Sequence, residues 1–332
     1  MFSIDAIARL ARTIVGGALA ALLAIAPAAI AEAAQKVTYL LPAPAFLPAF
    51  GPWMLAKGKG YYAEEGLEVE FVAARGGVDV AKQVGAGNAV IGGGIGDTPL
   101  IVRANGIPVK AVAVLGGGSL MILATDQEAG IDRVEDLKGR TVTTMSYQDT
   151  TFYALLGMLA SVGLTRNDID AQAAGPSNTW KLFIAGEADA MAAVPDWIAI
   201  AAAQGKKMNL FPADAHFRSM AQAILAADDV IAEQPELIGK LVRATLKGMR
   251  DIMADPEQAA RDYVKAVPQH EGQEKAMEAV FRLYNQHVYP GQETLGAMDA
   301  DRLAALQDFY VGEGIVREAV PVEDLYTNRF VQ

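Results

Sequence analysis

The chain has 332 residues, no cysteine and a formal net charge of −11. The lack of cysteine excludes disulfides, thiolate zinc sites and cysteine nucleophiles, so a chain of this length must rely on apolar cores. The acidic balance argues against nucleic acid as a partner, because binding to phosphates needs clustered lysine and arginine.

The first 31 residues have the pattern of a secretory signal peptide. Arg9 and Arg12 form a short positive region, residues 14–25 are apolar, and residues 29–31 fit the small-x-small pattern of a cleavage site. The apolar stretch is shorter than the about 20 residues of a membrane-spanning helix, and no cysteine follows it for lipid attachment. The sequence therefore predicts cleavage after Ala31 and an exported, soluble mature protein.

The rest of the chain alternates short apolar runs with amphipathic stretches, a pattern typical of α/β proteins. The predicted strands, in chain order, are residues 37–41, 67–73, 89–91, 109–115, 120–125, 140–145, 189–194 and 221–226. The predicted helices between them are residues 53–60, 78–85, 98–105, 151–162 and 195–204. From about residue 233 the chain is expected to be helical, with Pro235 and Pro256 at helix starts.

The strand–helix series occurs twice, which predicts two lobes. Lobe one is expected to combine residues 36–120 with residues 226–332, and lobe two to span residues 121–225. In open α/β sheets, ligands bind at the carboxyl ends of the strands, so the loops between strands and helices should carry the site.

Seven short motifs keep the order and spacing of a known family. They are residues 56–72 (AKGKGYYAEEGLEVEFV), 76–77 (GG), 86–94 (AGNAVIGGG), 106–115 (GIPVKAVAVL), 136–140 (DLKGR), 186–190 (GEADA) and 235–248 (PELIGKLVRATLKG). Through them the chain resembles the periplasmic solute-binding proteins of ABC importers, of the sulfonate, nitrate and thiamine-precursor class. The resemblance implies a type II periplasmic binding fold, with two α/β lobes, two crossovers and a ligand cleft between the lobes.

The resemblance also implies a function. A protein of this family captures a small molecule and delivers it to a membrane permease that works with a cytoplasmic ATPase. We expect no enzymatic activity, cofactor or metal site, and a monomer that meets the membrane only through the permease.

Two alternatives stay open. One is an enzyme like the thiamine-pyrimidine synthases of the same superfamily, which use a cysteine-rich iron motif that this chain lacks. The other is a periplasmic partner that presents its ligand to a sensor.

The candidate ligand-binding residues lie in the predicted cleft loops. Those of lobe one come from a proline-rich aromatic loop and a glycine-rich turn: Phe46, Phe50, Trp53, Gly96, Asp97 and Thr98. Those of lobe two come from turns that lead into helices: Tyr147, Gln148, Asp149, Thr150, Asn178, Trp180, Asp196 and Trp197.

The types of residue in these loops favour a flat organic ligand. All three tryptophans fall there, and aromatic side chains commonly line the pockets of such ligands. Asp97 or Thr98, and Asp149 or Thr150, are suited to cap helices whose free N–H groups would face the cleft. The alternative interpretation is that the same residues only pack in the core or cap the helices, without a role in ligand binding. We expect an aromatic or heterocyclic ligand that can carry an acidic group, although Asp149 would oppose a bare anion.

Overall fold

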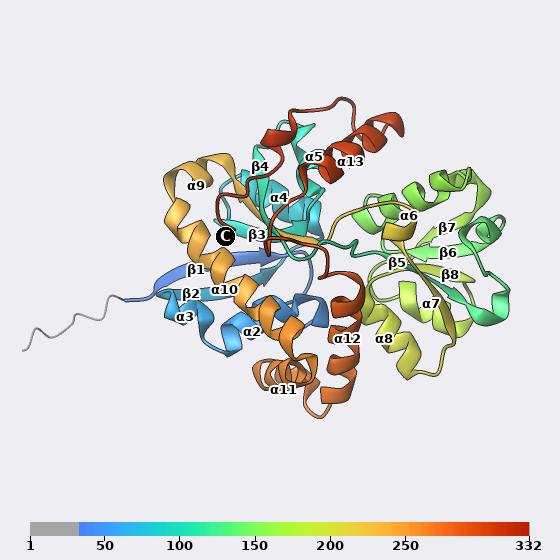
Figure 1. Cartoon of the computed structure of the whole chain (residues 1–332), viewed down its shortest axis with the longest axis horizontal. Helices are drawn as coiled ribbons and strands as arrows, with labels where there is room; N and C mark the ends of the chain where they lie inside the picture. The colour runs from blue at the N-terminus through green and yellow to red at the C-terminus, as the bar shows by residue number, and fades with distance from the viewer. Residues whose placement is uncertain (1–32, 332) are drawn as a thin grey trace, which may run out of the picture. The chain divides into compact units, whose positions relative to one another are not determined.

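A computed structural model describes residues 33–331 of the chain. The compact unit that spans Gln35–Gln332 contains two five-stranded sheets with helices around each (Figure 1). The predicted signal peptide lies outside the described residues. None of the helices described is both long enough and apolar enough to cross a bilayer.

The first sheet has the strand order β2-β1-β3-β10-β4. Its strands are β1 (Gln35–Leu41), β2 (Leu67–Ala73), β3 (Ile91–Ile95), β4 (Val109–Val114) and β10 (Gln222–Ala227). Strand β1 runs parallel to β2 and β3, whereas β10 is antiparallel to both β3 and β4. Every residue of β10 is buried, as expected for a strand inside the sheet with helices on both faces.

The second sheet has the order β7-β6-β8-β5-β9. Its strands are β5 (Ile122–Asp126), β6 (Thr141–Thr144), β7 (Asp170–Ala173), β8 (Ala190–Ala193) and β9 (Met208–Pro212). The sequence did not predict the two edge strands, β7 and β9. Neither has a buried residue, so neither shows the apolar signal of a core strand.

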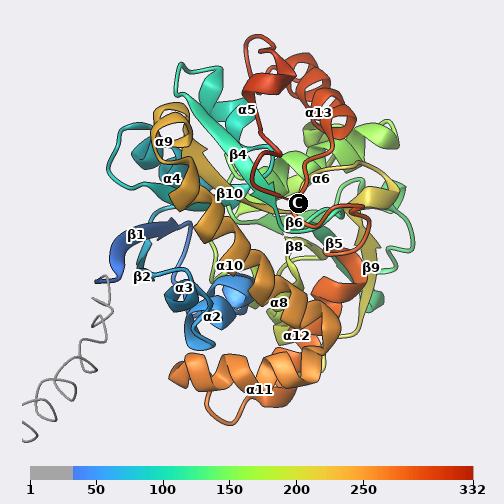
Figure 2. The same cartoon turned by 60° about the vertical axis from the view of Figure 1, so that its left-hand side comes forward.

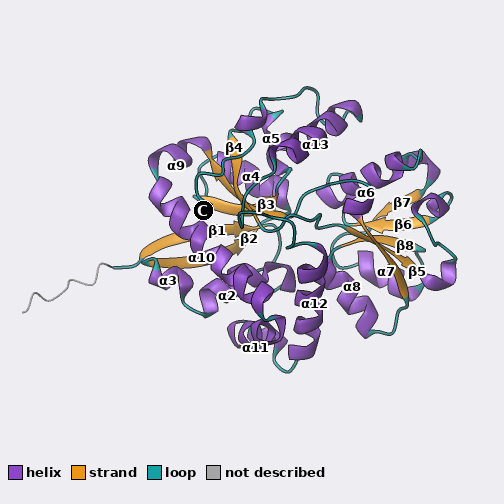
Figure 3. Ribbon diagram, in the orientation of Figure 1, coloured by secondary structure: helices purple, strands orange, loops and turns teal. Residues whose placement is uncertain are grey.

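The helices surround the two sheets (Figure 3). They are α2 (Gly51–Gly58), α3 (Tyr61–Glu64), α4 (Gly77–Gly85), α5 (Thr98–Arg103), α6 (Thr150–Ser161), α7 (Thr179–Ala185), α8 (Pro195–Ala203), α9 (Asp228–Glu233), α10 (Pro235–Ala254), α11 (Pro256–Ala266), α12 (Glu274–His287) and α13 (Ala300–Gly312). Helices α10 and α11 begin at Pro235 and Pro256, as the sequence predicted. A proline is favourable at the first helical position, because the N–H that it lacks would have no partner within the helix.

Helix α10 packs closely on the first lobe, beside α2 and α3 in Figure 2. A Cβ atom on Gly248 of α10 would lie 2.1 Å from the carbonyl oxygen of Pro52 in α2, so only glycine permits this approach. The hydroxyl groups of Tyr62 in α3 and Thr245 in α10 form a buried hydrogen bond of 2.7 Å. The motifs at residues 56–72 and 235–248 are therefore two sides of one helix contact.

The glycine-rich segment after Ile91 is a strand, where the sequence predicted a turn. Strand β3 continues to Ile95 because residues 92–95 pair with residues 222–225 of β10, and its glycines let helix α4 lie close to the sheet. A Cβ atom on Gly92 would lie 2.2 Å from Cγ1 of Val80 in α4. At Gly92 the missing side chain thus serves helix–sheet packing.

Two crossover segments, residues 115–121 and 213–221, join the sheets. Leu120 N donates to Met220 O at 3.1 Å between the crossovers, and Leu115 N donates to Gln222 O at 2.7 Å. The predicted fold class, two α/β lobes joined by two crossovers, is confirmed. The expected lobe boundary between residues 225 and 226 falls inside β10, whose pairing places the whole strand in the first sheet; the exact lobe limits stay a prediction.

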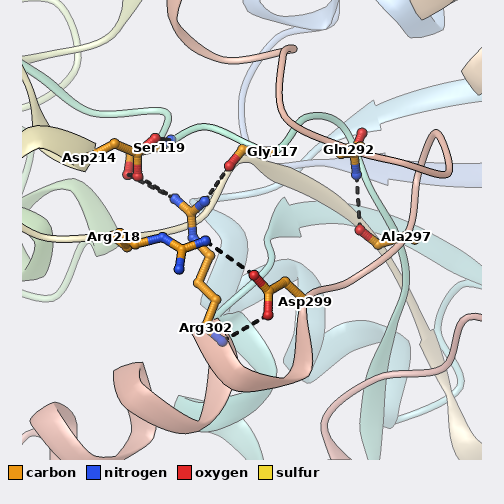
Figure 4. Close-up of polar contacts among 8 residues, drawn as sticks. All are labelled: Gly117, Ser119, Asp214, Arg218, Gln292, Ala297, Asp299 and Arg302. Carbon is orange, nitrogen blue, oxygen red and sulfur yellow. Dashed lines mark hydrogen bonds and ion pairs between the residues drawn. The ribbon is translucent and has the colours of Figure 1, made fainter.

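Arg302 of α13 holds both sides of this junction (Figure 4). Its guanidinium donates to the carbonyl of Gly117 and the hydroxyl of Ser119 in the first crossover, and it pairs with the carboxylate of Asp214. Ser119 donates its backbone N–H and its hydroxyl to the same carboxylate, each at 2.7 Å. The Arg302 side chain is only 4% exposed, so Asp214 is the counter-charge that makes its burial tolerable.

We expect Asp214→Asn to destabilise the protein by about 3 kcal/mol, because it removes the carboxylate that pairs directly with the buried guanidinium. This is the low end for buried pairs, since the Asp214 side chain is 31% exposed. Urea unfolding of the variant measures the loss. Asp308→Asn, which changes an exposed carboxylate on the same helix as Arg302, is the matched control. Equal stability of the two variants would contradict this role of Arg302.

Candidate functional site

A cleft of about 1610 Å³ is lined by residues of both lobes. The loops that follow β1, β3, β6 and β8 all contribute, as expected for a site at the carboxyl ends of strands. Helices α4, α7, α8 and α12 supply much of the remaining wall. Ligand sites for small molecules usually measure about 300 to 1,000 Å³, so this cleft has more room than one such ligand fills.

Four of the predicted aromatic residues line the cleft: Phe46, Phe50, Trp180 and Trp197. Phe46 is 40% exposed, whereas Phe50 is only 4% exposed. Both tryptophans are half-buried and pack on the apolar cluster between α8 and the second sheet. Trp197 also packs against the core of the first lobe. The cleft therefore has flat apolar surface from both lobes.

Trp53, predicted as part of the aromatic wall, is not among the residues that line the cleft. Helix α2 begins at Gly51, so Trp53 lies inside the helix rather than in the loop before it. Its side chain is 1% exposed and packs edge-on against Phe50 and Tyr39, with ring centres 5.9 and 6.4 Å away. Trp53 supports Phe50 from behind.

The turn after β3 contributes Thr98, but not Gly96 or Asp97. The N–H of Gly96 donates to Ala221 O at 3.0 Å, and the Asp97 carboxylate accepts a hydrogen bond from the Tyr310 hydroxyl. Burial raises the pKa of Asp97 to about 6. Its side chain makes no capping bond to α5. The hydrogen bonds of Gly96 and Asp97 therefore tie them to the crossover and to the core behind the cleft.

Gln148, Asp149 and Thr150 line the cleft from the second lobe. Asp149 is the N-cap of α6, as the sequence predicted, and accepts from Thr151 N at 2.9 Å. Burial raises the pKa of Asp149, against the effect of its hydrogen bonds from Thr151. This carboxylate occupies the helix N-terminus that an anionic ligand would need.

Tyr147 and Asn178, two of the predicted ligand-binding residues, lie outside the lining of the cleft. The Tyr147 hydroxyl donates to Ala171 O of β7 at 2.7 Å, and the Arg166 guanidinium lies 4.6 Å from its ring centre. Asn178 is exposed at the N-cap of α7 without a side-chain capping bond. Both residues precede helices in the predicted turns, but of the two only Tyr147 has a side-chain hydrogen bond to another described residue, and its partner lies in β7.

Two buried polar side chains line the cleft without a partner for one oxygen. Asp196, the second residue of α8, is 4% exposed, and its Oδ1 accepts no hydrogen bond within the described part of the chain. Gln222, the first residue of β10, is 5% exposed, and the same is true of its Oε1. Burial raises the pKa of Asp196 to about 6. The sequence predicted Asp196 but missed Gln222, whose signal was a lone polar residue in an apolar strand.

Helix α12 forms a wall of the cleft that the sequence did not predict. Ala276, Val280 and Leu283 are among its lining residues, and Leu283 packs against the apolar cluster of the second lobe. Figure 1 shows α12 beside α8. No local motif marks this contact, because almost 70 residues separate α8 from α12 in the sequence.

The loop that carries Phe46 is held from the side of α11. The carbonyl oxygen of Phe46 accepts from the Tyr263 hydroxyl at 2.6 Å and lies 2.7 Å from Nε2 of His270. Both contacts fix the backbone and leave the exposed Phe46 ring to the cleft. His270, which lines the cleft, thus has a structural role in this loop.

Charge is unevenly distributed over the cleft. The cationic residues Arg75, Lys82, Lys275 and Arg282 are exposed on its lining, whereas Asp149 and Asp196 are more deeply placed. Among residues 33–331, no three histidine or acidic side chains converge as a metal site would require.

The two α/β lobes and the cleft between them define a periplasmic binding protein fold. Residues 47–259 match the model of the NMT1/THI5-like family, and the chain belongs to this family.

Two relatives and one solved structure show the range of this similarity. The riboflavin-binding protein RibY of Chloroflexus aurantiacus is 28% identical over 293 residues, which cover 85% of this chain and 82% of RibY. The 4-amino-5-hydroxymethyl-2-methylpyrimidine phosphate synthase of Aspergillus parasiticus is 25% identical over 250 residues, 70% of this chain and 71% of the synthase. The periplasmic aliphatic sulphonate binding protein SsuA of Escherichia coli has the same fold, with a TM-score of 0.68, 18% identity and coverage of 88% and 91%.

We expect Asp196→Asn to stabilise the ligand-free protein above about pH 6. Burial raises the folded-state pKa from 3.8 to about 6, so ionising this carboxylate disfavours the folded state as the pH rises through that interval. The increase in the free energy of unfolding over the wild type should reach up to about 3 kcal/mol above pH 6 and vanish below about pH 4. Thermal unfolding of both proteins between pH 4 and 8 provides the measurement, and a gain independent of pH would refute the assignment.

Proposed function

We propose that the protein is the substrate-binding component of an ABC importer and captures a flat aromatic heterocycle. The observation that carries this proposal is the aromatic lining of the cleft. Phe46 from the first lobe, with Trp180 and Trp197 from the second, offers ring surface for the faces of a planar ligand.

The acidic groups of the cleft argue against a small anion as the ligand. Sulfonate and nitrate need cations or free helix N-termini, but the N-terminus of α6 is already capped by Asp149. Asp196 occupies the first turn of α8 and is also a carboxylate. The exposed Arg75, Lys82 and Lys275 leave room for an acidic group only at the periphery of a larger ligand.

The relatives support a planar ring as the ligand. RibY is named for riboflavin, and the synthase relative is named for a substituted aminopyrimidine. Both molecules are flat nitrogen heterocycles that carry polar substituents. The likeness to SsuA supports the fold alone, because its identity is 18%.

Capture in this cleft requires the lobes to close on the ligand. The volume of about 1610 Å³ exceeds the usual range of about 300 to 1,000 Å³ for small-molecule sites. Hinge closure at the two crossovers would narrow the cleft and bury the ring. The closed form would then be the one that docks on the permease, after export directed by the signal peptide at residues 1–31.

A catalytic role is the alternative that the synthase relatives raise. Such an enzyme would consume its ligand, whereas a binding protein returns it unchanged. Mass spectrometry of riboflavin and of 4-amino-5-hydroxymethyl-2-methylpyrimidine after prolonged incubation with the purified protein separates the two functions. We expect both compounds to be recovered intact, and a new product would refute the proposed transport function.

We expect the purified protein to bind at least one of these two compounds, and Trp180→Ala to weaken that binding at least about tenfold, or about 1.4 kcal/mol. The reason is the loss of ring surface from the cleft wall. Calorimetric titration gives the dissociation constants, and Phe330→Ala serves as a control because Phe330 is a partly buried aromatic outside the cleft lining. Tight binding of an alkanesulfonate, with no binding of either heterocycle, would overturn the proposal.

A further inference from the structure

We propose that Asp196 and Gln222 recognise the N–H edge of the ligand ring, and so restrict the cleft to nitrogen heterocycles that carry a ring N–H or an amino group. This inference rests on the proposed function and deepens it. The aromatic residues would contact the faces of the ring, whereas these two acceptors would form hydrogen bonds with the N–H groups on its edge.

One oxygen of each side chain has no hydrogen-bond donor among the described residues. Asp196 Oδ1 and Gln222 Oε1 are buried and accept no hydrogen bond from any described residue. A buried acceptor without a donor destabilises a fold, and such groups are rare unless a ligand or water completes them. Both residues line the one cleft in which a ligand is expected.

Asp196 and Gln222 come from different lobes. Gln222 pairs with Ile95 at the carboxyl end of β3 in the first sheet. Asp196 follows β8 of the second sheet, at the start of α8. A ligand with donors on its edge can therefore satisfy one acceptor from each lobe. Such a ligand would favour the closed arrangement over the open one, which couples recognition to closure.

The carboxylate of Asp196 and the carboxamide of Gln222 differ in the hydrogen bonds that they can form. An ionised carboxylate only accepts hydrogen bonds, and it accepts them more strongly than a neutral oxygen. The carboxamide of Gln222 accepts through Oε1 and donates through Nε2, so it matches an edge with an N–H beside a carbonyl or ring nitrogen. A carbocyclic aromatic ring offers no such donor, and an anionic substituent would be repelled by Asp196. The predicted class is thus neutral or cationic rings with at least one N–H donor.

The experiment compares each heterocycle with a partner that lacks the donor. The probes are riboflavin with 3-methylriboflavin, and 4-amino-5-hydroxymethyl-2-methylpyrimidine with its 4-dimethylamino analogue. Methylation removes the N–H donors and leaves the faces of the ring in place. For the probe that binds, we expect methylation to weaken the affinity of the wild-type protein at least about tenfold.

The variants test which residues read the donor. Asp196→Asn should weaken binding of the unmethylated probe at least about tenfold and reduce the effect of methylation to about threefold or less. Gln222→Met, which keeps the length of the side chain, should weaken the same probe at least about threefold. Asp308→Asn is the control for loss of one negative charge, and it should change neither value.

The outcomes separate this inference from the proposed function. If a heterocycle binds but methylation or Asp196→Asn has no effect, recognition by Asp196 is wrong and the proposed function stands. If neither heterocycle binds the wild-type protein, the proposed function fails and this inference fails with it. Because Asp196→Asn is expected to be more stable than the wild type above about pH 6, its melting temperature shows whether lost affinity reflects unfolding.

Discussion

The return of the chain into the first sheet through β10 is the constraint on which the rest of the structure depends. Strand β10 lies between β3 and β4 and is antiparallel to both. The chain therefore leaves the first sheet after β4 and re-enters it at β10 on the same edge, where the carboxyl end of β4 meets the start of β10. The hydrogen bonds from Gly96 and Leu115 to residues 221 and 222 fix this geometry, and Arg302 binds the junction to α13. The cleft lies at this edge, and Gln222 is both the first residue of β10 and part of the cleft lining.

The candidate site joins apolar walls with polar groups that the fold leaves unsatisfied. Asp196 and Gln222 are buried without partners for Oδ1 and Oε1, which disfavours the ligand-free protein. The same arrangement favours a ligand with matching donors, because the unpaired state is then relieved on binding. Stability and recognition thus oppose each other at Asp196, as is common where a protein holds a polar group ready for its ligand.

Local patterns in the sequence predicted most of the fold, and most of the predicted ligand-binding residues line the cleft. Apolar runs predicted the inner strands, and the helix starts at Pro235 and Pro256 followed from the fixed geometry of proline. The edge strands β7 and β9 were missed because they bury little, and Trp53 was misplaced because α2 begins two residues earlier than predicted. The wall formed by α12 depends on contacts between distant segments, which no local pattern contains.

A crystal structure of the protein grown with riboflavin or the aminopyrimidine tests the central claim most directly. The account predicts one ring in the cleft, with its face on Trp180 or Trp197 and an N–H group within hydrogen-bonding distance of Asp196. It also predicts that Gln222 contacts the same ring from the opposite lobe. A ligand bound outside the cleft, or one whose ring turns its N–H groups to solvent, would contradict the account.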